Sequence, residues 1–417
     1  MTVTADTCHL VWIAPISWDG IPGTDRAMAT EMTRYARVLW VDPPVSAVTP
    51  ARLRGDIGGG ILPSLSAAGD GITRLTPVAL PGLSRPGVRA TTAPLLRAQI
   101  SWALRQLRIR PAAVVAGYLE DVLGRWDGAV SVLYVTDDHV AGAGLMGLSA
   151  GRLRAQERQA AARADVVAVV SPRLAEHWSA LGADPVLIPN GCYPGYAGAS
   201  PAAAVTGLPR PVVGLVGQLT ERIDVRLLEA VAEAGFSLLL VGPYDPRWER
   251  ERFAALIARP NVHSTGRVPA TEVPSYLAAM DAGLTPYADT AFNQASFPLK
   301  TLEYFSAGLP VVSTDLPGSR WLRDDLARSD PATASQLMAL ASDGTGFAAA
   351  VRRLAGEPGG SAAAEPPAGP EDGPARAASA RAFAGRHSWQ RRADALAAAI
   401  GLRAPRTTDH DGPPVRV

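Results

Sequence analysis

The segment VVGLVGQLTERIDVRLLEAVAEAG (Val212–Gly235) contains the strand–turn–helix unit on which the fold prediction depends. Its first part, VVGLVG, is an apolar run without polar alternation, which indicates a parallel strand buried on both faces. The part DVRLLEAVAEAG instead places its apolar residues at helical spacing. Gly217 ends the strand, and Arg222 lies where the helix opens. A strand followed at once by a helix predicts an α/β unit with a parallel sheet.

The same alternation extends in both directions from this segment. Strand-like apolar runs lie at 9–15, 38–43, 112–118, 131–136, 166–171 and 185–190 before it, and at 237–243, 261–266, 282–287 and 310–314 after it. Helical spacing returns at 24–36, 150–164, 247–258 and 271–280. A chain of 417 residues exceeds one ordinary core. We therefore predict two doubly wound parallel-sheet domains of the α/β class, with ligands at the carboxyl ends of the strands.

Changes in composition suggest where these domains begin and end. The segment 193–211 is rich in Ala, Pro and Gly, which is typical of an interdomain linker. We predict a first domain at 1–195, a linker at 196–209 and a second domain at 210–385. The segment 356–377 has low complexity and is expected to be a flexible loop. A final helix at 386–402 is expected to return to the first domain, and a disordered tail is expected at 403–417.

The overall composition argues against several classes of protein. A net charge of +1 gives no basic field for nucleic acid. Cys8 and Cys192 are the only cysteines and form no CxxC, so neither a disulfide framework nor a zinc ribbon is indicated. We see no signal-peptide pattern and no apolar run of about 20 residues. We therefore expect a cytoplasmic protein without a membrane-spanning segment.

The segment SFPLKTLEYFSAGLPVVSTD (296–315) contains Lys300, the only lysine among 40 Lys and Arg residues. Pro298 suits a first helical turn and Gly308 suits the residue after the helix. The start of a helix offers free N–H groups to a phosphate, and Lys300 adds a mobile charge. Glu303, one turn later, can accept two hydroxyl hydrogen bonds from a ribose. The alternative is an exposed ion pair between Lys300 and Glu303.

A second cation is predicted at the carboxyl end of the first strand of this domain. Arg222 precedes the helix and could bind a diphosphate through two N–H groups. The alternative is a surface ion pair of Arg222 with Asp224 or Glu221. Two cationic loops at one sheet edge, together with the glutamate at 303, predict a pocket for a nucleoside diphosphate.

The stretch from 212 to 315 resembles the donor domain of GT-B glycosyltransferases of family 4, also called group 1. The resemblance rests on GQLTERIDVRLL, LLLVGP, NVHSTGRVP, DAGLTPY and PLKTLEYFSAGLPVV, which occur in the family's order. The segment 164–191 is similar to the end of that family's acceptor domain. The resemblance implies a GT-B fold, in which two Rossmann-like domains face each other across a cleft.

The resemblance also implies roles for individual residues. Arg222 stands at the diphosphate-binding position, Glu303 would hold the ribose hydroxyls, and Arg267 and Val268 lie where the family binds the base. The other implied donor contacts are Gly217, Gln218, Pro298, Leu299 and Lys300.

Two positions depart from the family pattern. Gln218 replaces an arginine that many members carry. Ala295 replaces an acid that normally helps to position the transferred sugar.

The segment ISWDGIPGTDRAMATEM (16–32) follows the first strand of the chain. Gly20 and Gly23 predict a flexible turn, and Thr24 or Asp25 could cap the next helix. In the family this loop approaches the donor diphosphate and the acceptor, which makes Arg26 a candidate contact. The same loop contains Trp18. The alternative is ordinary turn chemistry beside a surface arginine.

The segment LYVTDDHVAGAG (133–144) brings two acids and a histidine to the carboxyl end of a strand. Asp137 or Asp138 could orient an acceptor hydroxyl, and His139 could contact donor or acceptor. These three are the candidate catalytic residues. The alternative is that one of the acids caps a helix. No cluster of metal ligands accompanies them, and the family needs no metal.

Between Gly71 and Leu119 the chain has seven arginines and no acid. Its segment 94–110 is amphipathic, so residues 85–110 are a candidate peripheral membrane contact. The favoured alternative is a helix that packs on its own sheet with a solvated basic side.

Taken together, the motifs predict a glycosyltransferase of the hexosyl or a related class. It would move a sugar from a nucleoside diphosphate sugar to an acceptor hydroxyl, and the resemblance implies retention at the anomeric carbon. The acceptor would be a cell-envelope glycan, a glycolipid, including a lipid-linked one, or a natural product. The donor is a co-substrate, and no cofactor or metal is expected. A UDP-sugar 2-epimerase of the same architecture, or a non-catalytic partner subunit, are the alternatives.

Overall fold

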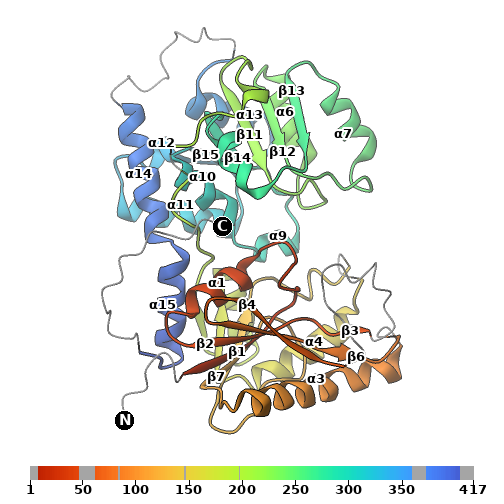
Figure 1. Cartoon of the computed structure of the whole chain (residues 1–417). Helices are drawn as coiled ribbons and strands as arrows, with labels where there is room; N and C mark the ends of the chain where they lie inside the picture. Colours follow the sequence, from red (N-terminus) through yellow and green to blue (C-terminus); the bar gives the residue numbers. More distant parts are fainter. Residues whose placement is uncertain are drawn as a thin grey trace. The chain divides into compact units, whose positions relative to one another are not determined.

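The computed structural model describes residues 8–46, 62–82, 85–144, 147–196, 198–358 and 372–403. These residues form two compact units. The described residues up to Pro189, together with those from Trp389 onward, make unit 1, whereas Asn190–Ser388 make unit 2. Each unit is an α/β structure built on its own sheet (Figure 1).

The sheet of unit 1 has the order β10-β9-β8-β7-β1-β2-β5-β4 in the described part of the chain. All neighbours are parallel except β4, which runs antiparallel to β5. A short ribbon of β3 and β6 lies apart from this sheet. The strands are β1 (His9–Ile13), β2 (Arg37–Val41), β3 (Val45–Ser46), β4 (Ser64–Gly69), β5 (Ile72–Thr76), β6 (Val78–Ala79), β7 (Ala113–Ala116), β8 (Val130–Val135), β9 (Val166–Val169) and β10 (Pro185–Leu187).

Unit 1 contains one helix from the far end of the sequence. Its helices are α1 (Thr24–Met32), α3 (Pro86–Leu107), α4 (Ala150–Ala161), α5 (Pro172–Ala180) and α15 (Trp389–Ala399). Helix α15 lies beside α1 (Figure 1). There Asp394 accepts hydrogen bonds from the Arg34 guanidinium at 2.9 Å and the Tyr35 hydroxyl at 2.5 Å.

The sheet of unit 2 is wholly parallel, with the order β13-β12-β11-β14-β15-β16. Its strands are β11 (Val212–Val216), β12 (Ser237–Val241), β13 (Val262–Gly266), β14 (Ala282–Thr285), β15 (Val311–Thr314) and β16 (Met338–Ala341). Counted along the chain, this order is 3-2-1-4-5-6, the order of Rossmann sheets, and it reverses between β11 and β14. Ligands of such sheets bind at that switch point.

The helices of unit 2 connect these strands. They are α6 (Val225–Glu233), α7 (Arg250–Ile257), α8 (Val273–Leu277), α9 (Ala291–Ala295), α10 (Leu299–Ala307), α11 (Pro317–Ser329), α12 (Ala334–Leu337), α13 (Gly344–Ala355) and α14 (Asp372–Arg386), with short 3₁₀ turns at Ala203–Val205 and Ala270–Glu272. Helix α10 ends at Gly308, whose φ of +85° favours glycine.

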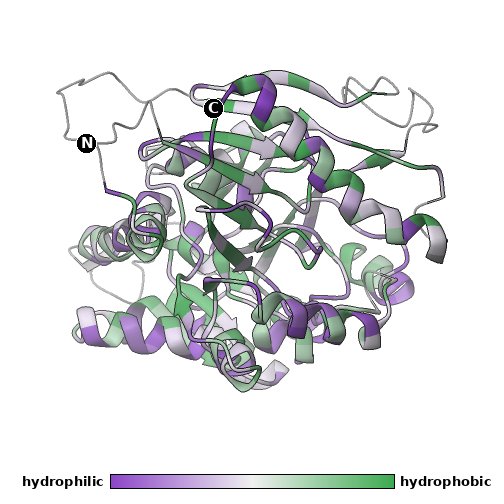
Figure 2. Ribbon diagram, turned by 90° about the horizontal axis from the view of Figure 1, so that it is seen from below, coloured by the Kyte–Doolittle hydropathy of each residue, from purple (hydrophilic) through white to green (hydrophobic). Residues whose placement is uncertain are grey.

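The central strands have the unbroken apolar runs that the sequence shows. All five residues of β11 and of β12 are buried. In Figure 2 the strands are mostly hydrophobic, whereas the helices are banded with polar and apolar residues. Parallel strands covered by helices on both faces require this pattern. Among the helices of the described residues, none is both long enough and apolar enough to span a bilayer.

Several predicted segments differ from the structure. Strands β4, β5 and β16 were not expected; β4 carries polar residues and pairs antiparallel, so it lacks an apolar run. The end of the predicted loop at 356–377 is wrong, because residues from 372 onward form α14, which packs on α10. Residues 359–371 of that loop, and the predicted tail apart from Arg403, lie outside the described residues.

The segment predicted as a linker is attached to unit 2. The Ala202 N–H donates to the Ser275 carbonyl at 3.0 Å, and Val205 is buried. Only Ala197 of this segment lies outside the described residues.

Candidate functional site

The switch point of unit 2 contains a pocket of about 200 Å³. It opens where β11 and β14 end, and the start of α10 forms one side. The polar lining comes from three segments: Gly217, Gln218, Thr220 and Arg222 after β11, Thr285 and Tyr287 at the end of β14, and Lys300 and Tyr304 from α10. Four of the predicted donor residues therefore line one pocket.

Tyr304 holds the two central strands apart at the floor of this pocket. The ladder between β11 and β14 pairs Val213 with Ala282 and Gly214 with Gly283. Beyond it, the Tyr304 hydroxyl accepts from the Val216 N–H at 2.8 Å and donates to the Leu284 carbonyl at 3.3 Å. The hydroxyl thus takes the place of a direct bond between the strands.

The fit of the Tyr304 ring depends on a glycine in β14. A Cβ on Gly283 would stand 2.3 Å from the ring of Tyr304, so this position requires glycine. Burial raises the pKa of Tyr304 well above its usual range, so the hydroxyl stays protonated. Sequence reasoning missed this residue, although it follows Glu303 directly in the PLKTLEY motif.

Glycines allow the loops after β11 and β12 to touch. Gly217 and Gly242 have φ values of +153° and +141°. A Cβ on Gly242 would stand 1.8 Å from the Gly217 carbonyl oxygen. The Gly242 N–H donates to the Gly266 carbonyl at 3.0 Å, which fixes the end of β13 to the same edge. Close backbone contact of this kind excludes any side chain at 242.

Arg222 is held by neutral groups. Its Nε donates to Asn293 Oδ1 at 3.1 Å and its Nη2 to Ser296 Oγ at 3.3 Å. The guanidinium also lies 5.0 Å from the ring centre of Phe292. In the described part of the chain no carboxylate pairs with it. Its charge is therefore not neutralised by a protein anion.

The alternative ion pair of Arg222 with Asp224 or Glu221 does not occur in the part of the chain that the structure describes. Asp224 caps α6 through the Arg226 N–H and forms a two-pronged pair with the Arg226 side chain, at 2.9 and 2.7 Å. Ala295, which stands where an acid was expected, is buried in α9 between Asn293 and Ser296. The side chains that hold Arg222 thus flank this alanine.

Lys300 both lines the pocket and forms the ion pair that was the alternative interpretation. Its Nζ lies 2.6 Å from Glu303 Oε2, and the two side chains are 33% and 19% exposed. Burial lowers the pKa of Lys300, but the charge and hydrogen bond of Glu303 outweigh this and raise it. Lys300 is therefore cationic at neutral pH, and Glu303 itself is not part of the pocket lining.

The remaining predicted donor residues do not line the pocket. Pro298 precedes α10 as its N-cap, and the Leu299 N–H donates to the Phe297 carbonyl at 2.9 Å, so this amide already has a partner. Arg267 is exposed and Val268 half-buried; both follow β13, the edge strand of the sheet.

In unit 1 the loop after β1 surrounds Trp18, which is 9% exposed. The Arg26 guanidinium lies 4.5 Å from the Trp18 ring centre, and its Nη1 donates to the Trp18 carbonyl at 3.1 Å. Gly20 closes a tight turn, donating to the Ser17 carbonyl at 2.9 Å. Gly23 is the N-cap of α1 and makes no side-chain cap bond. The expectation that Thr24 or Asp25 caps this helix is therefore wrong.

Asp25 has a different role from the expected cap. It is 5% exposed and accepts a hydrogen bond from the Trp12 indole at 2.9 Å. A Cβ on Gly117, which follows β7, would stand 2.3 Å from Asp25 Oδ1. Burial raises the pKa of Asp25 to about 7. The charge of Asp137 also raises this pKa, whereas the hydrogen bond from Trp12 lowers it. A buried carboxyl group that titrates near neutrality therefore lies between β1 and β7, where the order of this sheet reverses.

The three candidate catalytic residues follow β8. Asp137 Oδ2 accepts from the Thr136 hydroxyl at 3.2 Å. Asp138 Oδ1 accepts from the Ala141 N–H at 2.8 Å, so Asp138 caps a turn and not the helix that the alternative expected. His139 Nδ1 is buried and has no hydrogen-bond partner among the described residues. Burial, opposed by Asp138, lowers the pKa of His139. The imidazole is therefore neutral at pH 7 and can donate or accept a proton.

Helix α3 packs on unit 1 through an apolar side. Leu96, Ile100 and Leu104 are buried, and the Arg97 side chain bonds to Asp121 at 2.7 Å. In the described residues no group of three or more His, Cys, Asp or Glu side chains is arranged to hold a metal ion.

Comparison with known proteins identifies one family and one sequence relative. Residues 210–357 match the family described as glycosyl transferases group 1. The chain is 37% identical over 110 residues to TuaH of Bacillus subtilis (strain 168), which is named as a candidate teichuronic acid biosynthesis glycosyltransferase. That match covers 26% of this chain and 28% of TuaH, so it spans just over a quarter of the relative's length.

Solved structures resemble nearly the whole chain. Sucrose-phosphate synthase from Thermosynechococcus elongatus has a TM-score of 0.65 at 16% identity, covering 94% of this chain and 98% of the other. The lipopolysaccharide glycosyltransferase WaaG gives 0.59 at 15% identity, covering 94% and 99%. Anabaena HepE in complex with UDP gives 0.61 at 15% identity, covering 94% and 99%. At these identities the likeness concerns the fold, which is GT-B.

Proposed function

We propose that this protein is a glycosyltransferase that uses a nucleoside diphosphate sugar, because residues 210–357 match the glycosyl transferases group 1 family and the chain has the GT-B fold. The observation that carries the proposal is the pocket at the β11–β14 switch point, which Arg222 and Lys300 both line. Arg222, which has no acidic partner among the described residues, and the cationic Lys300 share one small pocket, and this arrangement suits a diphosphate.

The two cations have separate tasks in the proposed reaction. Arg222 is already in place, because Asn293 and Ser296 hold its guanidinium. Lys300 exchanges Glu303 for a phosphate oxygen when the donor binds, which frees Glu303 to accept the ribose hydroxyls. Both cations then stabilise the negative charge that develops on the leaving diphosphate.

Uridine is the base to test first. The HepE structures hold UDP and UDP-glucose, and an E. coli structure described as trehalose-6-phosphate is bound with UDP-2-fluoro glucose. We propose a hexosyl or related sugar as the transferred group, with retention, and a glycan, glycolipid or natural-product hydroxyl as the acceptor. Ala295 leaves the position of the expected sugar-binding acid without a carboxylate, so other groups must position the transferred sugar.

For the acceptor side we propose the residues of unit 1 that follow β1 and β8. His139 is neutral, and its Nδ1 has no partner within the described ranges, so it is suited to contact a sugar or acceptor hydroxyl. Arg26 is proposed to contact an anionic group. No metal or cofactor is part of this scheme. A cytoplasmic location, with peripheral contact at the inner face of the membrane through residues 85–110, stays a prediction.

The test is incubation of the purified chain with UDP- and GDP-sugars, with and without acceptors, while released nucleotide is measured. Release that depends on an added acceptor supports transfer. Isomerisation of the sugar without release would instead identify a 2-epimerase. An absence of both with every donor would contradict catalysis and favour a non-catalytic partner subunit.

A further inference from the structure

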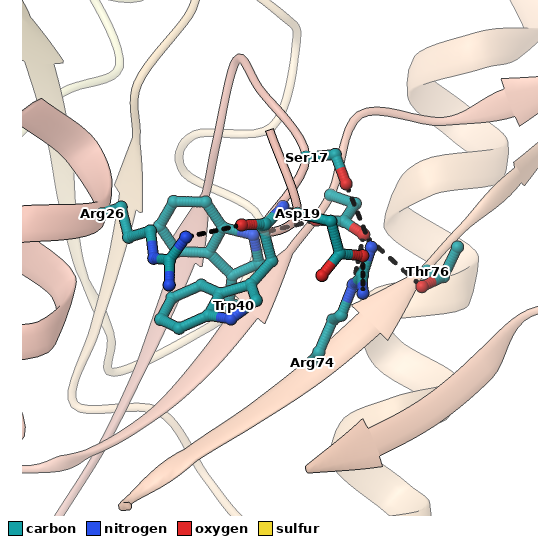
Figure 3. Close-up of polar contacts among 8 residues, drawn as sticks. Ser17, Asp19, Arg26, Trp40, Arg74 and Thr76 are labelled. Atoms are coloured by element: carbon teal, nitrogen blue, oxygen red, sulfur yellow. Dashed lines mark hydrogen bonds and ion pairs between the residues drawn. The ribbon is translucent and has the colours of Figure 1, made fainter. Parts of the chain in front are cut away.

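A buried charge pair lies beneath the loop that follows β1 in unit 1 (Figure 3). Asp42, directly after β2, is 1% exposed, and Arg74 in β5 is 8% exposed. Arg74 Nε donates to Asp42 Oδ2 at 2.6 Å. Asp42 also accepts from the Trp40 indole at 2.9 Å and from the Thr76 hydroxyl at 3.4 Å. Both charges are therefore paired and bonded, as burial requires.

The pair binds three consecutive residues of the loop. Arg74 Nη2 donates to Ser17 Oγ at 3.0 Å, and Arg74 Nη1 donates to Asp19 Oδ2 at 2.6 Å. The backbone N–H of Trp18 donates to Asp42 Oδ1 at 2.9 Å. Every nitrogen of the Arg74 guanidinium thus has its own partner, and two of those partners belong to the loop. Figure 3 shows Ser17 and Asp19 converging on Arg74.

The buried pair of Arg74 and Asp42 serves to order the loop and contributes little to the stability of unit 1. A buried ion pair adds little net stability, because desolvation offsets the attraction. Besides this pair, the loop is held by the Trp18 ring against Trp40 and by the Gly20–Ser17 turn, whereas Ile16 and Ile21 are exposed. Burial lowers the pKa of Arg74, but Asp42 and Asp19 outweigh this and raise it, so the anchor remains charged.

The anchored loop in turn places Arg26. The Trp18 ring packs edge-on against Trp40, with centres 5.1 Å apart, and its face carries the Arg26 guanidinium. Arg26 also donates to the Trp18 carbonyl. Among the described residues no carboxylate pairs with Arg26. The position of this cation is therefore set by the loop and not by an acid, and its remaining N–H groups can bind an oxyanion.

We propose that Arg74 is a positioning residue, which fixes Ser17–Asp19 so that Trp18 presents Arg26 to a phosphate or carboxylate oxygen of the acceptor. The inference deepens the proposed function and rests on it. Arg74 does not contact the substrate. Arg74 orders the loop that contains Trp18, Trp18 places Arg26, and Arg26 contacts the ligand.

The test uses one variant that leaves the buried pair of Arg74 and Asp42 intact and one that changes it. Asp19→Asn removes the exposed arm alone, whereas Arg74→Lys keeps the charge and can reach only one or two of the partners. Asp19→Glu is the rescue variant. Glu176→Gln is the matched control, because it breaks an exposed arginine–carboxylate pair of 2.8 Å elsewhere in unit 1. For each variant, hydrogen exchange of residues 16–23, UDP affinity, kcat and KM are measured on the full chain.

For Asp19→Asn and Arg74→Lys we expect exchange in 16–23 to accelerate about tenfold and kcat/KM to fall about tenfold. UDP affinity should change less than twofold, because the pocket of unit 2 is untouched. Asp19→Glu should recover most of the loss, and Glu176→Gln should resemble the wild type.

Unchanged exchange in both variants would overturn the anchor. Faster exchange with unchanged kcat/KM would overturn the positioning role. A wild-type chain that transfers no sugar from any donor would instead contradict the proposed function, and the exchange data would still decide whether Arg74 orders the loop.

Discussion

The guanidinium of Arg222 donates its Nε hydrogen to the amide oxygen of Asn293, 3.1 Å away, and not to a carboxylate. Asn293 is itself fixed, because its Nδ2 donates to the carbonyls of Arg222 and Ala288, both at 2.9 Å. The amide therefore orients the cation without neutralising it. In the proposed diphosphate pocket, this difference leaves the positive charge available to the ligand.

Arg222→Lys should weaken UDP binding about tenfold or more. Lysine keeps the charge but cannot bond Asn293 and Ser296 while also binding a phosphate through a second N–H. Isothermal titration with UDP measures the loss. Arg226→Lys is the matched control, since Arg226 pairs with Asp224 at the surface and should leave the affinity unchanged. Equal affinities of the wild type and Arg222→Lys would contradict the diphosphate role.

Lys300→Ala should also lower UDP affinity, by about ten- to a hundredfold, the range of a hydrogen bond to a charged group. Glu303→Gln breaks the same 2.6 Å ion pair but leaves the lysine in the pocket. We expect it to affect UDP less than Lys300→Ala does, and to affect uridine, which has the ribose but no phosphate, as strongly as UDP. If both variants weakened UDP and uridine alike, the pair would be only structural.

Tyr304→Phe should destabilise unit 2 by about 1–3 kcal/mol, because the buried Val216 N–H loses its acceptor. Chemical denaturation of the full chain, monitored through a probe in unit 2, measures this loss of stability. Tyr276→Phe serves as the control, as Tyr276 is buried in the same unit and its hydroxyl has no hydrogen bond among the described residues. A loss of stability no larger than that of the control would show that water replaces the hydroxyl.

Asp25 should make the stability of unit 1 fall as the pH rises. Its pKa is about 7 in the folded chain, against an ordinary value of 3.8 for an aspartate. Between these pH values the folded state holds a proton that the unfolded state has lost, so stability declines with pH, and above pH 7 the whole penalty applies. From pH 5 to pH 8 the decline is roughly 3 kcal/mol.

Asp25→Asn removes this pH dependence and keeps an acceptor for the Trp12 indole. The free energy of unfolding of Asp25→Asn, relative to that of the wild type, should therefore increase from pH 5 to pH 8. Thermal denaturation at the two pH values measures this difference. A stability difference that is the same at both pH values would mean that the carboxyl group titrates normally in the fold.

The sequence predicts what depends on local pattern. The apolar runs of β11 and β12, the end of α10 at Gly308 and the presence of Lys300 at the pocket all follow from periodicity or motif. Strand β4 could not be predicted, since an antiparallel edge strand does not need an apolar run. Tyr304 was overlooked because its role depends on Gly283, twenty-one residues earlier, which leaves room for the ring.

Long-range polar contacts were the least predictable part of the site. Nothing near Arg74 in the sequence indicates that it binds Ser17 and Asp19, 57 and 55 residues away. Asp25 was expected to cap a helix because of its place after Gly23, but the Trp12 indole on the neighbouring strand offers a partner that a local pattern cannot reveal.

The return of α15 to unit 1 has a practical consequence for dissecting the protein. Trp389 and Leu396 are buried, and Asp394 binds Arg34 and Tyr35 of the first unit. The chain therefore leaves unit 1 at Pro189 and re-enters it at Trp389. A fragment that stops at Pro189 would lack one of its own helices, and a single proteolytic cut would not yield two complete halves. Unit 1 is best produced alone by joining Pro189 to Trp389 through a short linker. Unit 2 is best produced alone as the single segment Asn190–Ser388.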